Sequence, residues 1–298
     1  MGARRATLLD GRPGGRTLGD HDLRAALEVC AQDAVGSVLA AGRLEQAVVV
    51  GMRSAGGVLW GYEVDDELVA LCWAGANLVP VVPADDPRVA ADALDAFAAL
   101  ARDAGRRCSS IVGPADAVLG LWERLSRVWP RAREIRGDQP SMVIDRAPLV
   151  AADPEVRRSR PDDLDLVLPA CISMFTEEVG YSPASGPNGP YEMRVRGLVG
   201  QGRSFARIEP VDGRRQVVFK AELGAVAGGV AQVQGVWVTP ARRGLRLSES
   251  GMAAVVEQTR SSVAPLVSLY VNGYNTRAIA AYEAVGFRRV GTYATVLF

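Results

Sequence analysis

One order of periodic segments occurs twice along this chain, and that repetition constrains the fold more than any other feature. Each half has a helix, a hairpin, a strand, a long helix, a strand, a further helix and a closing strand. Hairpins followed by strand–helix–strand units indicate a mixed α/β sheet. A chain of 298 residues is long enough for two such domains. The sequence therefore predicts a tandem α/β protein in which each domain has a mixed, largely antiparallel sheet flanked by helices.

The bounds of the expected elements follow from apolar periodicity and from prolines and glycines at their ends. In the first half we expect helices at 23–41, 87–105 and 117–128 and strands at 58–64, 68–73, 77–82, 109–112 and 141–144. In the second half we expect helices at 164–179, 191–199, 248–264 and 275–285 and strands at 156–160, 204–209, 216–223, 229–238, 267–271, 288–290 and 294–298. Residues 1–20 have no periodicity and are expected to form an irregular arm. Residues 147–154 carry two prolines and no pattern, which predicts a linker between domains 1–148 and 149–298.

Composition argues against several classes of function. Lys and Arg together number 34, as do Asp and Glu, so the net charge is zero. A nucleic-acid binder that relies on a positive field is therefore the hypothesis we rank last. Because His21 is the only histidine, a Ser-His-Asp triad or a histidine-rich metal site would have to include it. The four cysteines lie far apart and are expected to be buried apolar residues, with no metal bound.

No segment of the sequence predicts a membrane anchor. The basic residues near the N-terminus are not followed by the apolar run of a signal peptide. The most apolar stretch, residues 68–82, is interrupted by Gly75, Asn77 and Pro80 and is too short to span a bilayer. We therefore expect a cytoplasmic protein without a membrane partner.

The segment from residue 236 to residue 248 is the strongest chemical signal in the chain. Its residues run from a predicted strand into a predicted helix: Val236, Trp237, Val238, Arg243, Gly244, Leu245, Arg246, Leu247 and Ser248. A helix start presents free backbone N–H groups at the positive end of the helix dipole, which suits a phosphate group. The alternative is an ordinary strand-to-helix connection with arginines exposed to solvent.

A second signal lies at residues 271–287. Asn275 is placed to cap a helix, and Tyr282 follows two turns later on the same face. Gly286 and Phe287 are typical of a helix C-terminus followed by a core aromatic residue. Taken alone, Tyr282 is as well explained by core packing.

Together, these two segments resemble the GNAT superfamily of acetyl-coenzyme A-dependent N-acyltransferases. The phosphate loop of that family is written Q/R-x-x-G-x-G/A, and Arg243 takes its first position. The later signature of the family is an Asn, an Ala and then Tyr-x-x-x-Gly-Phe. It is matched here by Asn275, Ala278, Tyr282, Gly286 and Phe287. The resemblance covers residues 155–298, and the whole chain is similar to actinobacterial proteins in which a degenerate acetyltransferase-like domain precedes a working one.

The chain departs from the family pattern at three places. Arg246 stands where the family has a glycine, and Ser248 stands where it has Gly or Ala, so we expect weakened or reoriented binding of coenzyme A. Gln232 occupies the position of the glutamate that many members use as a base. The alternative bases are Glu222, Glu177 and Glu178, each of which has a simpler reading as a surface carboxylate. The first half has Asp85 and Asp86 where a diphosphate would lie, so no coenzyme A is expected there.

The resemblance implies an N-acetyltransferase that uses acetyl-coenzyme A as cosubstrate and an amine as acceptor, with direct attack of the amine on the thioester. Backbone N–H groups at Val236–Val238 would polarise the carbonyl, and Tyr282 would protonate the departing thiolate. Residues 180–190 and 191–199 would border the acceptor. We expect a monomer or homodimer. The alternative is a non-catalytic acyl-coenzyme A sensor or scaffold, which Gln232 and Arg246 favour.

Overall fold

We describe the protein from a computed structural model, for residues 14–184, 186, 188–211 and 213–298. The chain divides into two compact units. Unit 1 contains Met1–Pro140 and Gly291–Phe298, and unit 2 contains Ser141–Val290. Of the predicted arm, residues 1–13 lie outside the described residues, and the rest includes a short strand.

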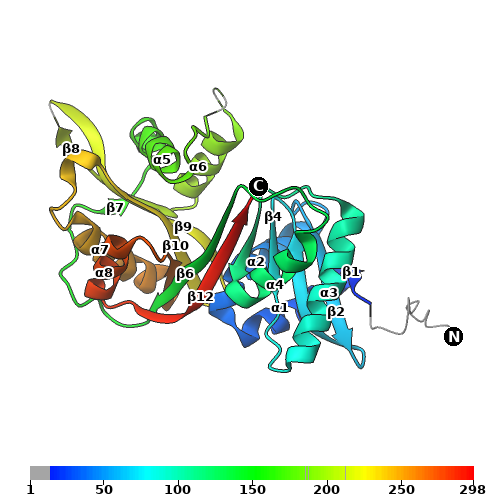
Figure 1. Ribbon diagram of the computed structural model, residues 1–298. Helices are drawn as coiled ribbons and strands as arrows, with labels where there is room; N and C mark the ends of the chain where they lie inside the picture. Colours follow the sequence, from blue (N-terminus) through cyan, green and yellow to red (C-terminus); the bar gives the residue numbers. More distant parts are fainter. Residues whose placement is uncertain (1–13, 185, 187, 212) are drawn as a thin grey trace. The chain divides into compact units, whose positions relative to one another are not determined.

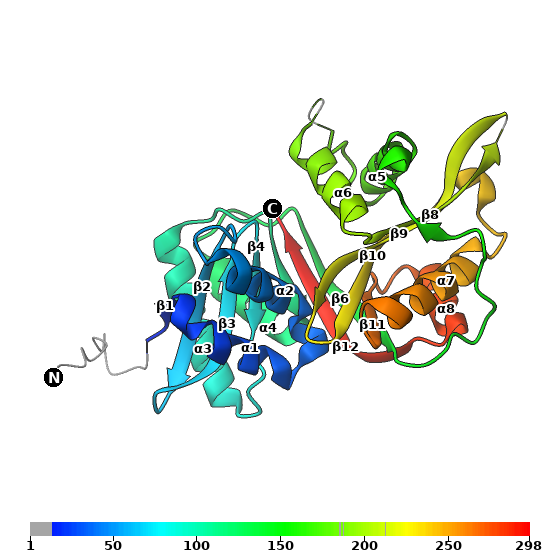
Figure 2. The same ribbon diagram turned by 180° about the vertical axis from the view of Figure 1, so that it is seen from behind.

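Unit 1 is a mixed sheet covered by helices on both faces (Figures 1 and 2). Its elements are β1 (Arg16–Leu18), α1 (Leu23–Gln32), α2 (Ala34–Val50), β2 (Val58–Val64), β3 (Glu67–Ala74), β4 (Asn77–Val81), α3 (Pro87–Ala104), β5 (Ser110–Pro114), α4 (Ala115–Leu125), the start of β6 (Glu134–Ile144) and the end of β12 (Arg288–Leu297). The described pairing follows the order β1-β2-β3-β4-β5-β12, in which only β4 and β5 are parallel. Helices α1 and α2 cover one face, and α3 and α4 cover the other.

Unit 2 repeats this plan. Its further elements are β7 (Arg157–Arg158), α5 (Leu164–Val179), α6 (Pro190–Gly200), β8 (Ser204–Val211), β9 (Arg214–Ala227), β10 (Val230–Val238), α7 (Leu247–Ser262), β11 (Leu266–Tyr270) and α8 (Thr276–Val285). The pairing follows the order β6-β11-β10-β9-β8-β7, in which only β10 and β11 are parallel. Both units therefore confirm the predicted mixed, largely antiparallel sheet flanked by helices.

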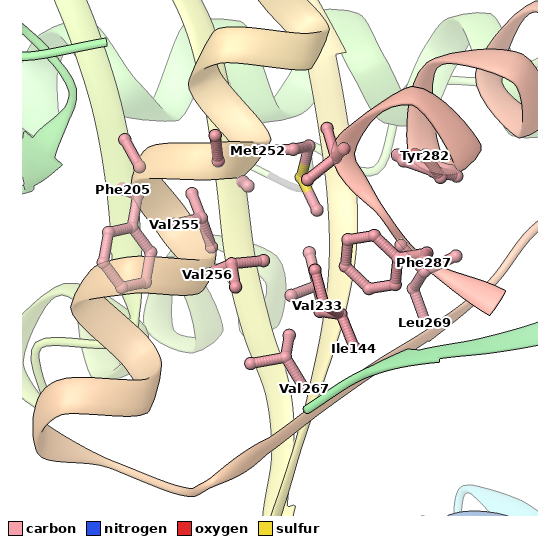
Figure 3. Packing of buried hydrophobic residues seen from close by; sticks show 14 of the residues in the cluster. Ile144, Phe205, Val233, Met252, Val255, Val256, Val267, Leu269, Tyr282 and Phe287 are labelled. Carbon is pink, nitrogen blue, oxygen red and sulfur yellow. The ribbon is translucent and has the colours of Figure 1, made fainter. Parts of the chain in front are cut away.

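The two faces of the unit 2 sheet differ sharply in polarity. Side chains alternate across a strand, so Phe219, Ala221 and Leu223 of β9 point into the apolar core under α7 and α8. This core also contains Val233 and Phe287 (Figure 3). The intervening side chains of β9 lie on the face that α5 and α6 cover, and two of them are charged. The charged side chains that are buried on this polar face therefore need ion-pair or hydrogen-bond partners.

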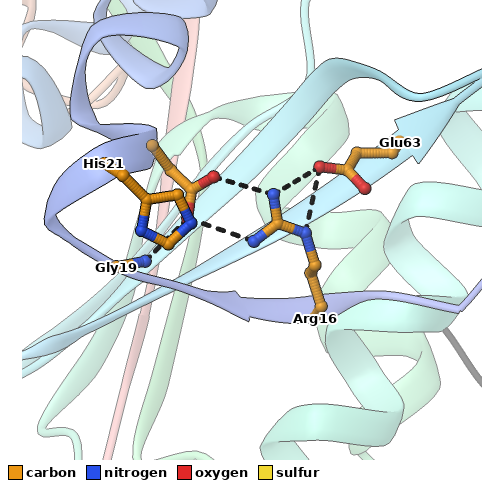
Figure 4. Close-up of polar contacts among 5 residues, drawn as sticks. Arg16, Gly19, His21 and Glu63 are labelled. Carbon is orange, nitrogen blue, oxygen red and sulfur yellow. Dashed lines mark hydrogen bonds and ion pairs between the residues drawn. The ribbon is translucent and has the colours of Figure 1, made fainter. Parts of the chain in front are cut away.

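A charged cluster at the start of the first helix occurs in both units. In unit 1, Arg16 donates two hydrogen bonds to Asp22, whose carboxylate also accepts from the Gly19 backbone N–H, and Arg16 also reaches Glu63 (Figure 4). In unit 2, Arg157 donates two hydrogen bonds to Asp163, and the Arg160 N–H donates to the same carboxylate. In each unit a 3-10 turn, Asp20–Asp22 or Pro161–Asp163, leads into the helix. The same spacing and the same contacts support a duplication that the sequence indicated only through its order of elements.

Two expectations about the elements are wrong. The helix predicted over 23–41 is two helices, because Asp33 leaves helical geometry and caps α2 by accepting from the Gly36 N–H at 2.8 Å. The two closing strands predicted at 288–290 and 294–298 are one strand, β12. Its residues Tyr293–Leu297 pair with β5 in unit 1. The unit 1 sheet is therefore completed by the C-terminal segment of the chain, whereas Ser141–Ile144 pairs with β11 inside unit 2. The domain boundary at 148/149 stays a prediction.

In the part of the chain that the structure describes, none of the helices combines the length and the apolar character that crossing a membrane requires. The four cysteines are buried and form no disulfide, in agreement with their reading as apolar core residues.

Candidate functional site

The candidate site of unit 2 begins where strands β10 and β11 cease to pair. The described register ends at Val233 and Leu269, whereas β10 continues to Val238. Backbone groups of a strand alternate in direction, so alternate N–H and C=O groups of residues 234–238 face away from β9. They have no partner strand in β11, which makes this the segment where an extended ligand can pair with the sheet.

The loop after β10 leads into α7 and is open to solvent. Pro240–Arg242 form a 3-10 turn, and residues 243–246 are exposed. Gly244 has φ of +83°, and Arg246 has φ of +59° and ψ of +19°, which is the left-handed region. This region favours glycine because a Cβ crowds the following carbonyl. The backbone thus adopts at Arg246 the conformation that a glycine would accept more readily.

In the part of the chain that the structure describes, no side chain caps the N-terminus of α7. Arg246 is the N-cap residue and makes no side-chain cap hydrogen bond. Among the described residues, no acceptor is found for the backbone N–H groups of residues 244–248. Free N–H groups at the positive end of a 16-residue helix form an anion receptacle. The corresponding helix of unit 1, α3, is closed instead, because Asp86 accepts from the Arg88 N–H at 2.8 Å.

Each arginine of the loop is held by a carboxylate. Arg243 pairs with Glu177 of α5 at 2.6 Å and also donates to the Val238 carbonyl at 3.0 Å. The same carboxylate accepts from Trp237 Nε1 at 3.2 Å. Arg242 pairs with Glu209 at 2.9 Å, and Arg246 pairs with Glu249 at 2.8 Å. A phosphate that binds Arg243 therefore has to compete with Glu177.

Tyr282 lies in α8 with only 7% of its surface exposed, and its ring packs near Phe287 (Figure 3). Among the described contacts, none is a hydrogen bond of its hydroxyl. Burial raises the pKa of Tyr282, and the nearby Glu178 carboxylate of α5 raises it further. The hydroxyl is therefore protonated at neutral pH, and its role as a proton donor stays a prediction.

Asn275, Gly286 and Phe287 have clear local roles. Asn275 caps α8 by accepting from the Ala278 N–H at 3.2 Å. Gly286 ends the helix at φ of +109°, and the N–H of Phe287 donates to the Tyr282 carbonyl. These contacts fix the position of Tyr282 in α8, while a contact of Asn275 with a ligand stays a prediction.

The candidate bases occupy different environments. Glu222 is 2% exposed and pairs with Lys220 at 2.8 Å and Arg194 at 3.1 Å. Burial by itself raises the pKa of Glu222, but the Lys220 ammonium and the Arg194 guanidinium outweigh it and hold the pKa below its usual range. Such a carboxylate accepts a proton poorly.

Gln232 is also 2% exposed, and no hydrogen bond of its side chain is found among the described residues. Glu177 is bound to Arg243 and Trp237. Glu178 is exposed at the end of α5 and acts electrostatically on the Tyr282 hydroxyl. The catalytic roles of these residues stay predictions.

Sequence reasoning missed Lys220 and Arg194, which surround Glu222. One signal was present: Lys220 is the only lysine among 34 basic residues. It is also completely buried. Arg194 gave no comparable signal, because contact between α6 and β9 depends on tertiary packing.

The predicted acceptor border contains a small cavity of about 30 Å³. Its lining comes from α5, the loop after it and α6: Leu168, Ile172, Ala184, Gly186, Gly189, Tyr191 and Glu192. Tyr191 donates from its hydroxyl to the Cys171 carbonyl at 2.9 Å. Its volume suits about one water molecule.

Comparison with protein families gives two matches. Residues 203–287 match the acetyltransferase (GNAT) family, and residues 57–167 match a domain of unknown function (DUF4081). The first match contains β8, β9, β10, the loop, α7, β11 and α8. Among curated proteins no sequence matches this chain.

Several solved structures share the fold along almost the whole chain. A GCN5-related N-acetyltransferase from Sphaerobacter thermophilus has 16% identity and a TM-score of 0.61, with 97% of this chain and 96% of that one covered. A tandem GNAT protein from the clavulanic acid biosynthesis pathway has 16% identity and a TM-score of 0.54, with 95% and 98% covered. A GNAT-family acetyltransferase from Colwellia psychrerythraea has 11% identity and a TM-score of 0.54, with 95% and 99% covered. The tandem fold is thus shared with acetyltransferases.

Proposed function

This chain carries a domain of the acetyltransferase (GNAT) family at residues 203–287, and on that premise we propose that unit 2 transfers an acetyl or short acyl group from acyl-coenzyme A to an amine. The observation that carries the proposal is the uncapped N-terminus of α7. It opens on an exposed arginine-bearing loop, directly after the part of β10 that β11 does not pair. A diphosphate at the helix and an extended pantetheine arm along β10 would satisfy both sets of backbone groups.

The reaction we propose is direct attack of the amine nitrogen on the thioester carbonyl carbon. Backbone N–H groups at Val236–Val238 stabilise the oxyanion that forms. When the carbon–sulfur bond breaks, the electron pair goes to sulfur, and Tyr282 donates its hydroxyl proton to the thiolate. Glu178, directly or through a water molecule, takes the proton that the amine loses. Solvent then returns a proton to Tyr282 and removes one from Glu178.

The acceptor in this proposal is a small or exposed amine that reaches β10 past α6 and residues 180–189. Unit 1 has the same sheet but a capped α3, and we assign it a structural role without coenzyme A.

The test is release of free coenzyme A by the purified full chain, measured with acetyl-coenzyme A and a panel of amines. We expect release above the hydrolysis background with at least one amine, and loss of that release in Tyr282→Phe. Calorimetric binding of acetyl-coenzyme A without release across a broad panel would favour the sensor instead. That alternative is supported by Gln232 at the family's base position and by the Glu177–Arg243 contact.

A further inference from the structure

The polar face of unit 2 contains a buried ammonium group that the proposed chemistry does not use. Lys220 of β9 is 0% exposed, and its Nζ donates to Glu222 Oε1 at 2.8 Å. A buried ammonium without partners is very costly, so its contacts indicate what it does. Every other basic side chain of this sequence, apart from His21, is an arginine. An ammonium is a compact point charge with three donors, whereas the guanidinium of arginine is planar and larger.

The second partner of Lys220 is a backbone group at a β-bulge. Two residues of β10, Gly235 and Val236, lie opposite the single residue Ala221 of β9, because the pairing shifts between Gln234 and Trp237. Gly235 has φ of +60°. The Lys220 Nζ donates to the Gly235 carbonyl at 2.9 Å. The chain therefore turns at Gly235, whose carbonyl accepts a hydrogen bond from the buried ammonium of Lys220.

The space around the bulge is closed on the same side. A Cβ atom added to Gly235 would lie 3.1 Å from Lys220 Nζ and 3.4 Å from the Glu222 carboxylate. Glu222 is held in turn by Arg194 of α6 through Oε2 and by the Cys171 thiol of α5 through Oε1. The ammonium thus has a fixed position between a rigid carboxylate and the bulge.

We propose that Lys220 is a positioning residue: its bond to the Gly235 carbonyl fixes the bulge and so aims at the acyl carbonyl those backbone N–H groups of Val236–Val238 that face away from β9. This inference rests on the proposed function. Lys220 touches neither cosubstrate nor acceptor. Its effect passes through the direction of the β10 backbone immediately after the bulge, where pairing with β11 has ended.

The expected effect on catalysis is large because oxyanion stabilisation depends on geometry. Loss of one aligned donor lowers kcat by about 100- to 1000-fold, and a misplacement of about 1 Å costs about 100-fold. For Lys220→Met we expect a 10- to 100-fold lower kcat. The KM for acetyl-coenzyme A should change less than about threefold, because residues 243–248 of the phosphate loop are untouched.

A double variant separates positioning from stability. Breaking one partner of a buried ion pair destabilises a fold strongly, whereas neutralising both partners is often tolerated. Lys220→Met/Glu222→Gln is therefore expected to recover much of the thermal stability that Lys220→Met loses. It should not recover kcat, since the Gly235 carbonyl still lacks its donor. The control for destabilisation is Val256→Ala, which creates a cavity at a 0% exposed position of α7. This variant should lose stability but keep the wild-type kcat.

Hydrogen–deuterium exchange supplies a readout that does not depend on activity. In the double variant, the amides of residues 234–238 should exchange faster than in wild type, while those of β8 should not change. A double variant with wild-type kcat, or with wild-type exchange at 234–238, would overturn the inference. If wild type releases no coenzyme A with any amine, the proposed function fails. The exchange comparison still decides whether Lys220 holds the bulge.

Discussion

Removal of the Glu177 carboxylate should tighten binding of acetyl-coenzyme A. Glu177 contacts Arg243 at 2.6 Å, and the two side chains are 43% and 45% exposed, so this is a surface ion pair. Such pairs contribute about 0.2–1 kcal/mol. A phosphate that takes Arg243 from Glu177 must overcome that contribution. Glu177→Gln should therefore lower the dissociation constant by a factor of about 1.4 to 5.

Calorimetric titration of the full chain with acetyl-coenzyme A measures this effect. Removing any nearby negative charge also favours a phosphate through the general field, and that contribution needs its own control. Glu178→Gln removes the same charge one residue further along α5, whereas the ion pair with Arg243 is made by Glu177. The excess of the Glu177→Gln effect over the Glu178→Gln effect is the part due to the contact.

Equal effects of the two variants would refute competition at Arg243. The advantage of Glu177→Gln should also shrink between 50 mM and 500 mM salt, since salt screens an exposed pair. Turnover gives a further check on the assignment of Glu177. If Glu177 is the general base, its Gln variant will bind more tightly but lose most of its activity, whereas the competition argument predicts that activity persists.

Three further predictions concern the loop, the acid and the repeated cluster. Arg246→Gly should bind acetyl-coenzyme A more tightly in calorimetry, because glycine accepts the left-handed backbone and removes a crowding Cβ; unchanged binding would contradict this. An indispensable general acid contributes at least about 100-fold to kcat. Because a thiolate can also leave without a proton donor, Tyr282→Phe should lower kcat by at least about 10-fold. Because its pKa is raised, wild type should show no loss of activity from this group between pH 7 and 10.

In the same series, Asp22→Asn and Asp163→Asn should each cost about 1–3 kcal/mol at pH 7 through loss of charged hydrogen bonds. Hydrogen bonds from arginine hold the pKa of both carboxyls below its usual range, so their stabilisation is complete above about pH 4 and is lost as pH falls further. Denaturant unfolding between pH 2 and 7 should show a flatter acid dependence in both variants.

Much of the fold follows from local patterns in the sequence. The helix at 164–179 is α5, since its apolar stripe and terminal glycine act locally. The break at Asp33 was missed because the apolar periodicity continues through it, and only the capping contact with Gly36 ends α1. The order of the elements in the sequence does not predict that β12 pairs with β5 of unit 1. A closing strand is expected to pair within its own half of the chain.

The candidate site was predictable only in part, for a related reason. The loop and Tyr282 are contiguous motifs, and the departure at Arg246 coincides with a left-handed residue. Glu222 could point to either face of β9 until tertiary packing placed it under α6 beside Lys220. Burial and ion pairing depend on contacts across the sheet, which a strand pattern does not contain.

The two units share one order of elements, and the start of one helix differs between them. Both have the arginine–aspartate cluster before the first helix, where it links the first strand to the 3-10 turn that leads into that helix. At the later helix, unit 1 has Asp86, whose carboxylate takes up the Arg88 N–H and adds negative charge at the positive end of α3. Unit 2 has Arg246 there and leaves its N–H groups without a protein acceptor among the described residues. A carboxylate cap stabilises a helix and also repels a phosphate. A single substitution that places a carboxylate at this helix start can therefore keep the fold and prevent binding of the ligand.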